Sequence, residues 1–150
     1  MRAEIEKKMK GTADYIFRHP EISEQEVQSS RALAAFLEEE GFALSWGIAG
    51  FETAFLAQWG QGKPIIGFLA EYDALPGMGQ EVCSARRPSG GLGHGCGHNL
   101  LGTACAGAAC ALKERMEKEG LSGTVRVYGC PAEETVIGKI RMNAEGVFDD

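Results

Sequence analysis

Two short segments of the chain contain the kinds of side chain that bind divalent metals. Residues 93–99 have the sequence GHGCGHN, which supplies the thiol of Cys96 and the imidazoles of His94 and His98. Further along, Glu133 and Glu134 are two adjacent carboxylates. Proteins hold zinc with thiolate, imidazole and carboxylate groups, and a metal held in this way activates water for hydrolysis. The residue types therefore indicate a hydrolytic metal site.

The spacing of Cys96 and His98 favours a shared ion. Residues two apart in an extended segment project to the same side, and the intervening glycine lets the backbone fold closely around a metal. A helix expected directly after His98 would present its positive N-terminal end to Cys96 and favour the thiolate. The alternative is a structural glycine-rich loop in which the histidines and the cysteine are incidental.

Asp73, Glu133 and Glu134 each follow an expected strand, where the active sites of α/β proteins gather. Adjacent carboxylates point in different directions, so one of the glutamates can bind a metal while the other transfers a proton. Asp73 can hydrogen-bond a ligating imidazole. The alternatives are a solvated helix start for the two glutamates and a simple turn residue for Asp73.

The pattern of apolar residues predicts the elements that must position these groups. We expect helices over 2–18, from 23 to 41, from 99 or 100 to 120 and from 134 or 135 onward, and strands over 43–47, 53–59, 65–70 and 124–129. Residues 76–97 are rich in glycine and form a long loop, which is typical of functional segments. This order predicts an α/β fold built in layers.

Two of these elements carry more specific expectations. Residues 23–26, SEQE, form a capping box that opens the second helix, which then carries Val27, Ala34 and Leu37 inward. Residues 65–70 are continuously apolar, which is typical of a strand covered on both faces.

Composition excludes several classes of protein. The chain has 150 residues, enough for one domain, and a formal net charge of −6, which argues against a nucleic-acid or anionic-membrane partner. Its apolar runs are shorter than the roughly 18 residues of a membrane span, and the charged segment MRAEIEKK differs from a secretory signal. We therefore expect a cytoplasmic protein with free thiols, in which Cys105, Cys110 and Cys130 are core residues.

Four segments occur in a specific order: HPEIS at 19–23, EYDALPG at 71–77, GHGCGHN at 93–99 and PAEE at 131–134. Together they resemble the M20 family of metallopeptidases and amidohydrolases. Within it they are similar to the aminobenzoyl-glutamate hydrolase branch and to related N-acyl-amino-acid and dipeptide hydrolases. The resemblance covers nearly all of the chain and implies the α/β/α layered sheet of the zinc-peptidase type.

The resemblance implies an amidohydrolase with two divalent metal ions that cleaves the amide bond of an N-acyl or N-aminoacyl amino acid. Cys96 would bridge the two metals, and His98 and Glu134 would bind them. Glu133 would be the general base that takes a proton from the attacking water and returns it to the leaving amine. Asp73 would support the metal site. Zinc suits this set of donors, with manganese and cobalt as alternatives.

Three neighbouring positions complete the resemblance. Glu71 stands where other branches of the family have a histidine ligand, and we assign it no role. His94 matches a frequent motif position without being a ligand. Asn99 replaces the aspartate of the commoner amidohydrolase branch, which fits the aminobenzoyl-glutamate side.

Family members are far longer, with a lid and dimerisation domain and two further histidine ligands. We therefore expect residues 1–150 to be the N-terminal half of a catalytic domain, inactive alone, and the complete protein to be a homodimer that acts on a small-molecule amide. The alternative is a truncated, non-catalytic domain that binds a metal or a partner. Half of a sheet exposes apolar surface, so we expect the isolated chain to self-associate.

Overall fold

The computed structural model describes residues 2–149. Its elements, in chain order, are α1 (Ala3–Arg18), α2 (Val27–Glu39), β1 (Ala43–Trp46), the 3₁₀ turn η1 (Ile48–Gly50), β2 (Phe55–Gln61), β3 (Ile65–Ala70), β4 (Leu75–Pro76), β5 (Leu92–Gly93), α3 (His98–Glu119), β6 (Gly123–Gly129) and α4 (Gly138–Ala144). The three long helices and strands β1, β2, β3 and β6 lie within a few residues of their predicted positions.

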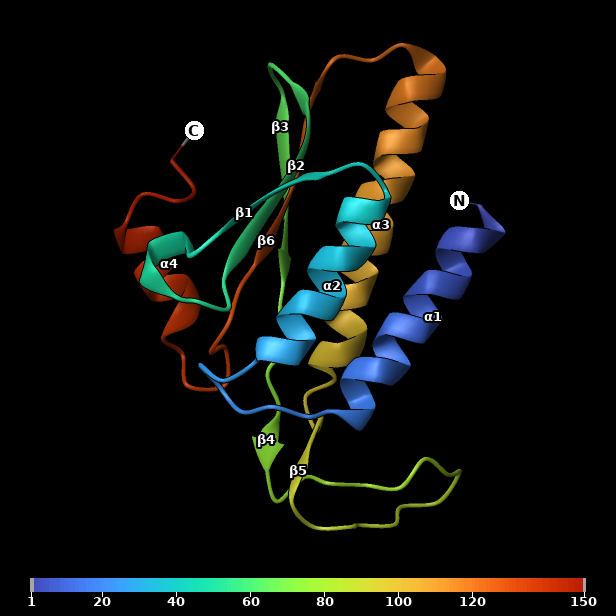
Figure 1. Cartoon of the computed structure of the whole chain (residues 1–150), viewed down its shortest axis with the longest axis vertical. Coiled ribbons are helices and arrows are strands. Elements are labelled where there is room, and N and C mark those ends of the chain that lie inside the picture. Colours follow the sequence, from blue (N-terminus) through green and yellow to red (C-terminus); the bar gives the residue numbers. More distant parts are fainter. Residues whose placement is uncertain (1, 150) are drawn as a thin grey trace.

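One sheet of four strands forms the middle layer, in the order β1-β2-β6-β3. The β1–β2 and β2–β6 pairs are antiparallel, whereas β3 and β6 are parallel. Helices α1, α2 and α3 cover one face of this sheet, and α4 lies on the other (Figure 1). There, Met142 of α4 is fully buried against a small cluster that includes Tyr128. The predicted layered α/β fold is confirmed.

The crossover from β3 through α3 to β6 brings distant segments to one end of the sheet. Because the two strands are parallel, Ala70 pairs with Gly129 and the C-terminal ends of both strands lie side by side. Helix α3 connects the two strands and runs in the opposite direction, so its N-terminus, which begins at His98, lies at that end of the sheet too (Figure 1). Residues that follow β3 and β6 therefore meet the start of α3.

The small side chains of α3 let it pack closely on the sheet and on α1. A methyl group added at Gly102 would lie 2.4 Å from the carbonyl oxygen of Glu71, which is rigid backbone. One added at Gly107 would lie 2.2 Å from the sulfur of Met9, which is the end of a flexible side chain. Close packing at Gly102 thus fixes the height of α3 above the end of β3.

The prediction of a capping box at residues 23–26 is wrong. The hydroxyl of Ser23 donates to Asp73, 2.8 Å away, and α2 begins only at Val27. The orphan N–H groups in the first turn are those of Gln28 and Ser29, and both donate to the carboxylate of Glu21. The segment before α2 therefore bonds across the molecule, and a residue further upstream caps the helix.

The inward face of α2 was predicted only in part. Ala34 and Leu37 are buried as expected, but the side chain of Val27 is 42% exposed.

The start of the last helix was also predicted too early, since α4 begins at Gly138. Ala132 and Val136 have φ values of 55° and 59°, and this left-handed backbone cannot continue a helix.

Strand β3 is not covered on both faces. It forms one edge of the sheet, and Ile66 and Leu69 are 41% and 42% exposed. Ile66 and Leu69 point to opposite faces of the strand, so among residues 2–149 the continuous apolar run is incompletely covered on each face.

The predicted long loop contains a short ribbon. Strands β4 and β5 pair at the lower end of the molecule in Figure 1, and the segment between them projects beneath α1.

Among residues 2–149, no helix has both the length and the apolar character needed to cross a membrane.

Candidate functional site

A buried imidazole lies at the centre of the site. His98 is only 2% exposed, and its Nδ1 is 2.9 Å from Oδ1 of Asp73, which is itself 1% exposed. This contact places the ring proton on Nδ1, where it is donated to the carboxylate. The other ring nitrogen, Nε2, is then left with its lone pair for another partner.

Two further carboxylates face that nitrogen. Oε2 of Glu71 is 3.1 Å from Nε2, and Oε2 of Glu133 is 3.6 Å away. A lone pair that points at two carboxylate oxygens is repelled by them unless a cation lies between, either a proton or a metal ion. The geometry therefore fits a bound cation at Nε2.

The charges and hydrogen bonds of the site shift the pKa values of His98 and Asp73 in opposite directions. Burial lowers the pKa of His98, but the hydrogen bond and charge of Asp73, together with the other carboxylates, outweigh it and raise the pKa overall. Burial raises the pKa of Asp73, but the hydrogen bonds that this carboxylate accepts outweigh burial and keep its pKa below the ordinary value. The pair is held as a charged carboxylate beside a basic ring.

The segment after β6 brings Glu133 and Glu134 to the ring. The backbone N–H of Glu134 donates to Oδ2 of Asp73, 2.9 Å away. Its side chain then lies with Oε1 3.7 Å from Nδ1 of His98. This buried oxygen has no hydrogen-bond partner in the described part of the chain, and burial, with the charge of Asp73, raises the pKa of Glu134 against the opposing effect of His98.

Cys96 lies at the open side of this cluster and is exposed. The expectation that the start of α3 favours its thiolate is wrong for the metal-free chain. Partial loss of solvation and the negative charges of Glu134 and Glu133 raise the pKa of the thiol. Desolvation is the largest of these effects, and a cation in the site would oppose the rise in pKa.

The side chains form two groups whose ligand atoms lie within 4.8 Å of one another. One contains Cys96, His98 and Glu134, and the other contains Glu71, His98 and Glu133. Each group joins a buried imidazole to donors from separate segments of the chain. The unpartnered oxygen of Glu134 and the facing acceptors at Nε2 of His98 are what a cation would satisfy, so these residues fit a metal site.

The structure adds two residues that sequence reasoning did not assign to the site. Glu71 is two residues before Asp73 and both contact His98, while Tyr72 between them is buried in the core. Lys139 of α4 forms an ion pair with Glu71 and lies 3.7 Å from Oε1 of Glu133. The alternation at residues 71–73 could have revealed Glu71, whereas no motif points to Lys139.

His94 and Asn99 tie the GHGCGHN segment to α1. Nε2 of His94 is 3.1 Å from the carbonyl oxygen of Ile16, and the amide of Asn99 donates to that of Ala13, 3.2 Å away. Pro20 has no N–H to donate to the carbonyl of Ile16, which instead accepts the N–H of His19 at 3.2 Å in addition to the imidazole. His94 therefore contacts the end of α1.

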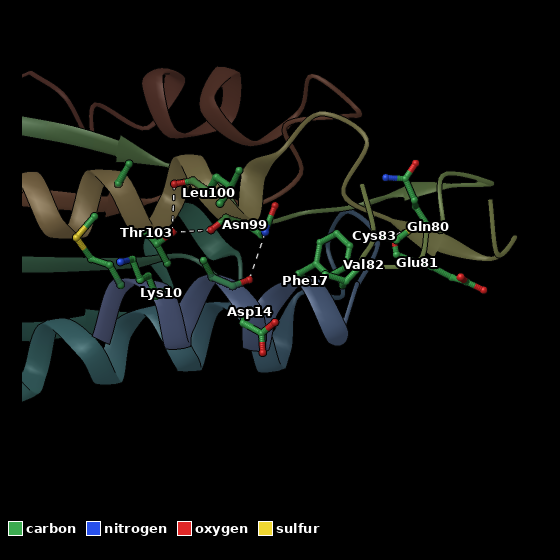
Figure 2. Close-up of a pocket in the computed structure, with 13 residues that line it drawn as sticks. Lys10, Asp14, Phe17, Gln80, Glu81, Val82, Cys83, Asn99, Leu100 and Thr103 are labelled. Carbon is green, nitrogen blue, oxygen red and sulfur yellow. Dashed lines mark hydrogen bonds between the residues drawn. The ribbon is translucent and has the colours of Figure 1, made fainter. Parts of the chain in front are cut away.

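A separate hollow of about 650 Å³ lies on the other side of this segment, between α1, α3 and residues 80–83 (Figure 2). Asn99 lines it, whereas the neighbouring His98 faces the carboxylates. Its wall is mainly apolar, with Met9, Phe17 and Leu100 among the lining residues. The two candidate donor groups described above lie outside it.

Comparison with known proteins supplies the family. The model of peptidase family M20/M25/M40 matches residues 67–150, which include every residue of the two donor groups. The chain belongs to this M20 family. Its curated relatives include one of the subunits of the p-aminobenzoyl-glutamate hydrolase of Escherichia coli (strain K12), which is 50% identical over 141 residues. The Xaa-Arg dipeptidase of Homo sapiens is 38% identical over 151 residues.

A solved structure of the M20 family has the same fold. The YXEP protein of Bacillus subtilis, described as a dinuclear metal binding peptidase from the M20 family, superposes with a TM-score of 0.81 at 28% identity. The alignment covers 98% of this chain and 41% of that one. The two curated relatives are matched over 92% and 89% of this chain, which spans 29% and 31% of their lengths.

Proposed function

We propose that the chain is the N-terminal part of the catalytic domain of a metal-dependent M20 amidohydrolase. The enzyme cleaves the amide bond of an N-acyl or N-aminoacyl amino acid, such as an aminobenzoyl-glutamate-like compound or a dipeptide. The observation that carries this proposal is the convergence of two three-residue donor groups on the buried ring of His98. The names of the curated relatives, a p-aminobenzoyl-glutamate hydrolase and a dipeptidase, support the substrate class.

Two divalent metal ions belong to this proposal. Cys96, His98 and Glu134 would hold metal, and Glu71 is an additional donor beside Nε2 of His98. The mixture of sulfur, nitrogen and oxygen donors suits zinc, with manganese or cobalt as alternatives. The dinuclear M20 peptidase of similar fold supports the count of two.

When bound, the metal ions supply a water molecule that is acidic enough to ionise near neutral pH. Glu133 accepts the proton of the attacking water on a carboxylate oxygen and delivers it to the nitrogen of the leaving amine. Its side chain is 33% exposed, so it can reach a bound substrate, whereas Asp73 is buried. Asp73 acts by fixing the ring of His98 through Nδ1.

The complete enzyme is proposed to be a cytoplasmic homodimer in which segments beyond residues 1–150 complete the site. All five cysteines are free, which agrees with a reducing compartment. The rival proposal is a non-catalytic domain that binds one metal or a partner, because the chain spans only 29% and 31% of the lengths of the two curated relatives named above.

Metal content tests the proposal first. We expect about one zinc or cobalt ion per isolated chain after purification without chelator, since three donors and water complete a tetrahedral site. We expect about two in the complete protein, together with release of p-aminobenzoate from p-aminobenzoyl-glutamate or hydrolysis of a dipeptide. His98→Ala should abolish binding, while His19→Ala, which removes an exposed imidazole at the end of α1, is the matched control. A folded chain without metal, and a complete protein without hydrolysis, would favour the rival.

A further inference from the structure

A second buried carboxylate, outside the donor groups, holds the segment that carries Glu133 and Glu134. Glu26 lies at the start of α2 and is 0% exposed. It is more than a hundred residues from this segment in the sequence, and the mechanism above gives it no role. A carboxylate that is taken out of water in this way is costly unless its oxygens are satisfied.

Both oxygens of Glu26 are bonded to the protein. Oε1 accepts the backbone N–H of Ala132 at 2.8 Å and that of Glu24 at 2.9 Å. Oε2 accepts the hydroxyl of Thr53 at 3.1 Å. The bond to Ala132 is the only one of these three that reaches the catalytic segment, and it ends one residue before Glu133.

The backbone at that point needs to be held. Ala132 has φ of 55°, a conformation that a residue with a side chain adopts at a cost of about 1 kcal/mol or more. Two residues later, the N–H of Glu134 donates to Asp73. The residue on each side of Glu133 therefore donates its backbone N–H to a buried carboxylate.

The two carboxylates are themselves connected through the segment before α2. Ser23 donates its hydroxyl to Asp73, and the N–H of Glu24 donates to Glu26. Residues 23–26 thus connect Asp73 and Glu26, the two carboxylates that accept the backbone N–H groups of Glu134 and Ala132. This is the part of the chain in which a capping box was predicted and is absent.

We propose that Glu26 is a positioning residue, which sets the backbone of Ala132 so that Glu133 and Glu134 point at His98. The proposal rests on the proposed function in one respect, namely that Glu134 binds metal. Glu26 contributes an oxygen atom at hydrogen-bonding distance from the N–H of Ala132. The negative charge of the carboxylate is not required, because a neutral oxygen also accepts a hydrogen bond from a backbone N–H. The shape of the loop at 130–138 depends on this bond.

Two substitutions separate reach from charge. Glu26→Gln keeps an oxygen at the same reach and loses the charge, and its amide NH₂ can donate to the hydroxyl of Thr53. Glu26→Asp keeps the charge but withdraws the oxygens by one methylene from Ala132. Leu33→Ala is the control, because it removes a fully buried side chain of the same helix from the main core cluster, which does not include Ala132.

The bond is tested first without metal, by residue-resolved hydrogen exchange of the whole chain. We expect the amides of Ala132 and Glu134 to exchange at least about tenfold faster in Glu26→Asp than in Glu26→Gln, beyond the change at Val125 in central β6. Leu33→Ala should accelerate all of these amides by similar factors. Equal exchange at Ala132 in the Asp and Gln variants would overturn the proposal.

The consequence for the site is tested with Co²⁺, followed by the thiolate-to-cobalt charge-transfer band and the ligand-field spectrum. We expect Glu26→Asp to weaken Co²⁺ binding about 10–100-fold and to change the ligand-field intensity, as loss of an outer-shell contact does. Glu26→Gln should bind within about twofold of the unmodified chain, and Leu33→Ala should leave the affinity unchanged. Equal weakening in the Gln and Asp variants, or in Leu33→Ala, would overturn the proposal.

Failure of the two proposals gives different results. If the unmodified chain binds no Co²⁺, the metal site of the proposed function fails, and the exchange data alone decide about Glu26. If it binds Co²⁺ and Glu26→Asp binds equally well, the metal site stands and the positioning role fails.

Discussion

The chemistry of the site depends on one imidazole that contacts several acids. Asp73 takes the Nδ1 side of His98, which leaves Nε2 facing Glu71 and Glu133. A site with this much negative charge gains stability from any cation that enters it. The ion pair of Lys139 with Glu71 supplies part of that compensation.

The roles of the two adjacent glutamates can be separated by mutation in the complete enzyme. Glu133→Gln removes a proton acceptor, so we expect turnover to fall by about 10²–10⁴-fold while the metal content is unchanged. Steady-state kinetics and elemental analysis on the same preparation measure both quantities. Glu134→Gln is the matched variant and should lose metal instead. Full turnover in Glu133→Gln would remove this residue from the role of base.

Glu26 makes the stability of the chain depend on pH. Burial raises its pKa, and the hydrogen bonds that it accepts offset this only in part. A carboxyl with a raised folded-state pKa contributes stability that is present below its unfolded pKa and is lost as pH rises through the folded value. The neighbouring Tyr72 stays neutral, because burial and then the negative charge of Glu26 raise the pKa of its hydroxyl well above the ordinary value.

Glu26→Gln should therefore become more stable relative to the unmodified chain as pH rises. We expect the two to differ little near pH 4, about where a free glutamate titrates, and to diverge toward neutral pH. Urea unfolding at a series of pH values between about 4 and 8 measures the difference. Glu4→Gln, an exposed position in α1, is the control and should show no such trend. A constant difference across the range would contradict the prediction.

Sequence reasoning named most residues of the candidate site but not their contacts. Cys96, His98 and the two glutamates stood out because their types and spacing are unusual in a chain of this composition. Glu26 and Lys139 could not be recognised, since a lone acid at a helix start and a lone lysine in a helix are usually solvated. Their roles in the structure come from tertiary contacts alone.

At the level of elements, the distance between α3 and the end of β3 is set by Gly102. Alanine there would gain about 1 kcal/mol of helix propensity but would meet the carbonyl of Glu71. We expect Gly102→Ala to lower the free energy of unfolding by about 1–3 kcal/mol, as overpacking does. Gly107→Ala is the control in the same helix and should cost less, because Met9 can move. Thermal or urea unfolding of both variants gives the comparison, and equal effects would contradict it.

The elements whose prediction failed are those that bond outside their own segment. Residues 23–26 have the composition of a capping box, but Ser23 has a stronger partner in the charged carboxylate of Asp73. The helix start at Glu134 failed because Ala132 is held in a left-handed conformation by a distant residue. The long helices and β6 were predicted well because their apolar periodicity is fixed by packing on the sheet.

For the whole molecule, the edge strand β3 is the exposed part of the core. Ile66 and Leu69 lie on it, and an apolar edge strand tends to associate with other chains. We expect the isolated chain to form concentration-dependent oligomers in sedimentation velocity, and Leu69→Lys to shift it toward monomer. Val82→Lys, which changes an exposed apolar residue far from this edge, should have no such effect. A chain that is monomeric at all concentrations would contradict the prediction.

The parallel pairing of β3 with β6 also determines when the site can exist during synthesis. Ile65 pairs with Thr124, and among the strands of residues 2–149 β3 has no neighbour in its sheet until β6 has left the ribosome. Glu71, Cys96 and His98 emerge earlier but have no fixed arrangement before that pairing closes. A nascent chain stalled before β6 should therefore bind metal no better than an unfolded peptide with the same side chains. We therefore expect capture of the proposed metal ions to be a late event, which follows the closure of the crossover.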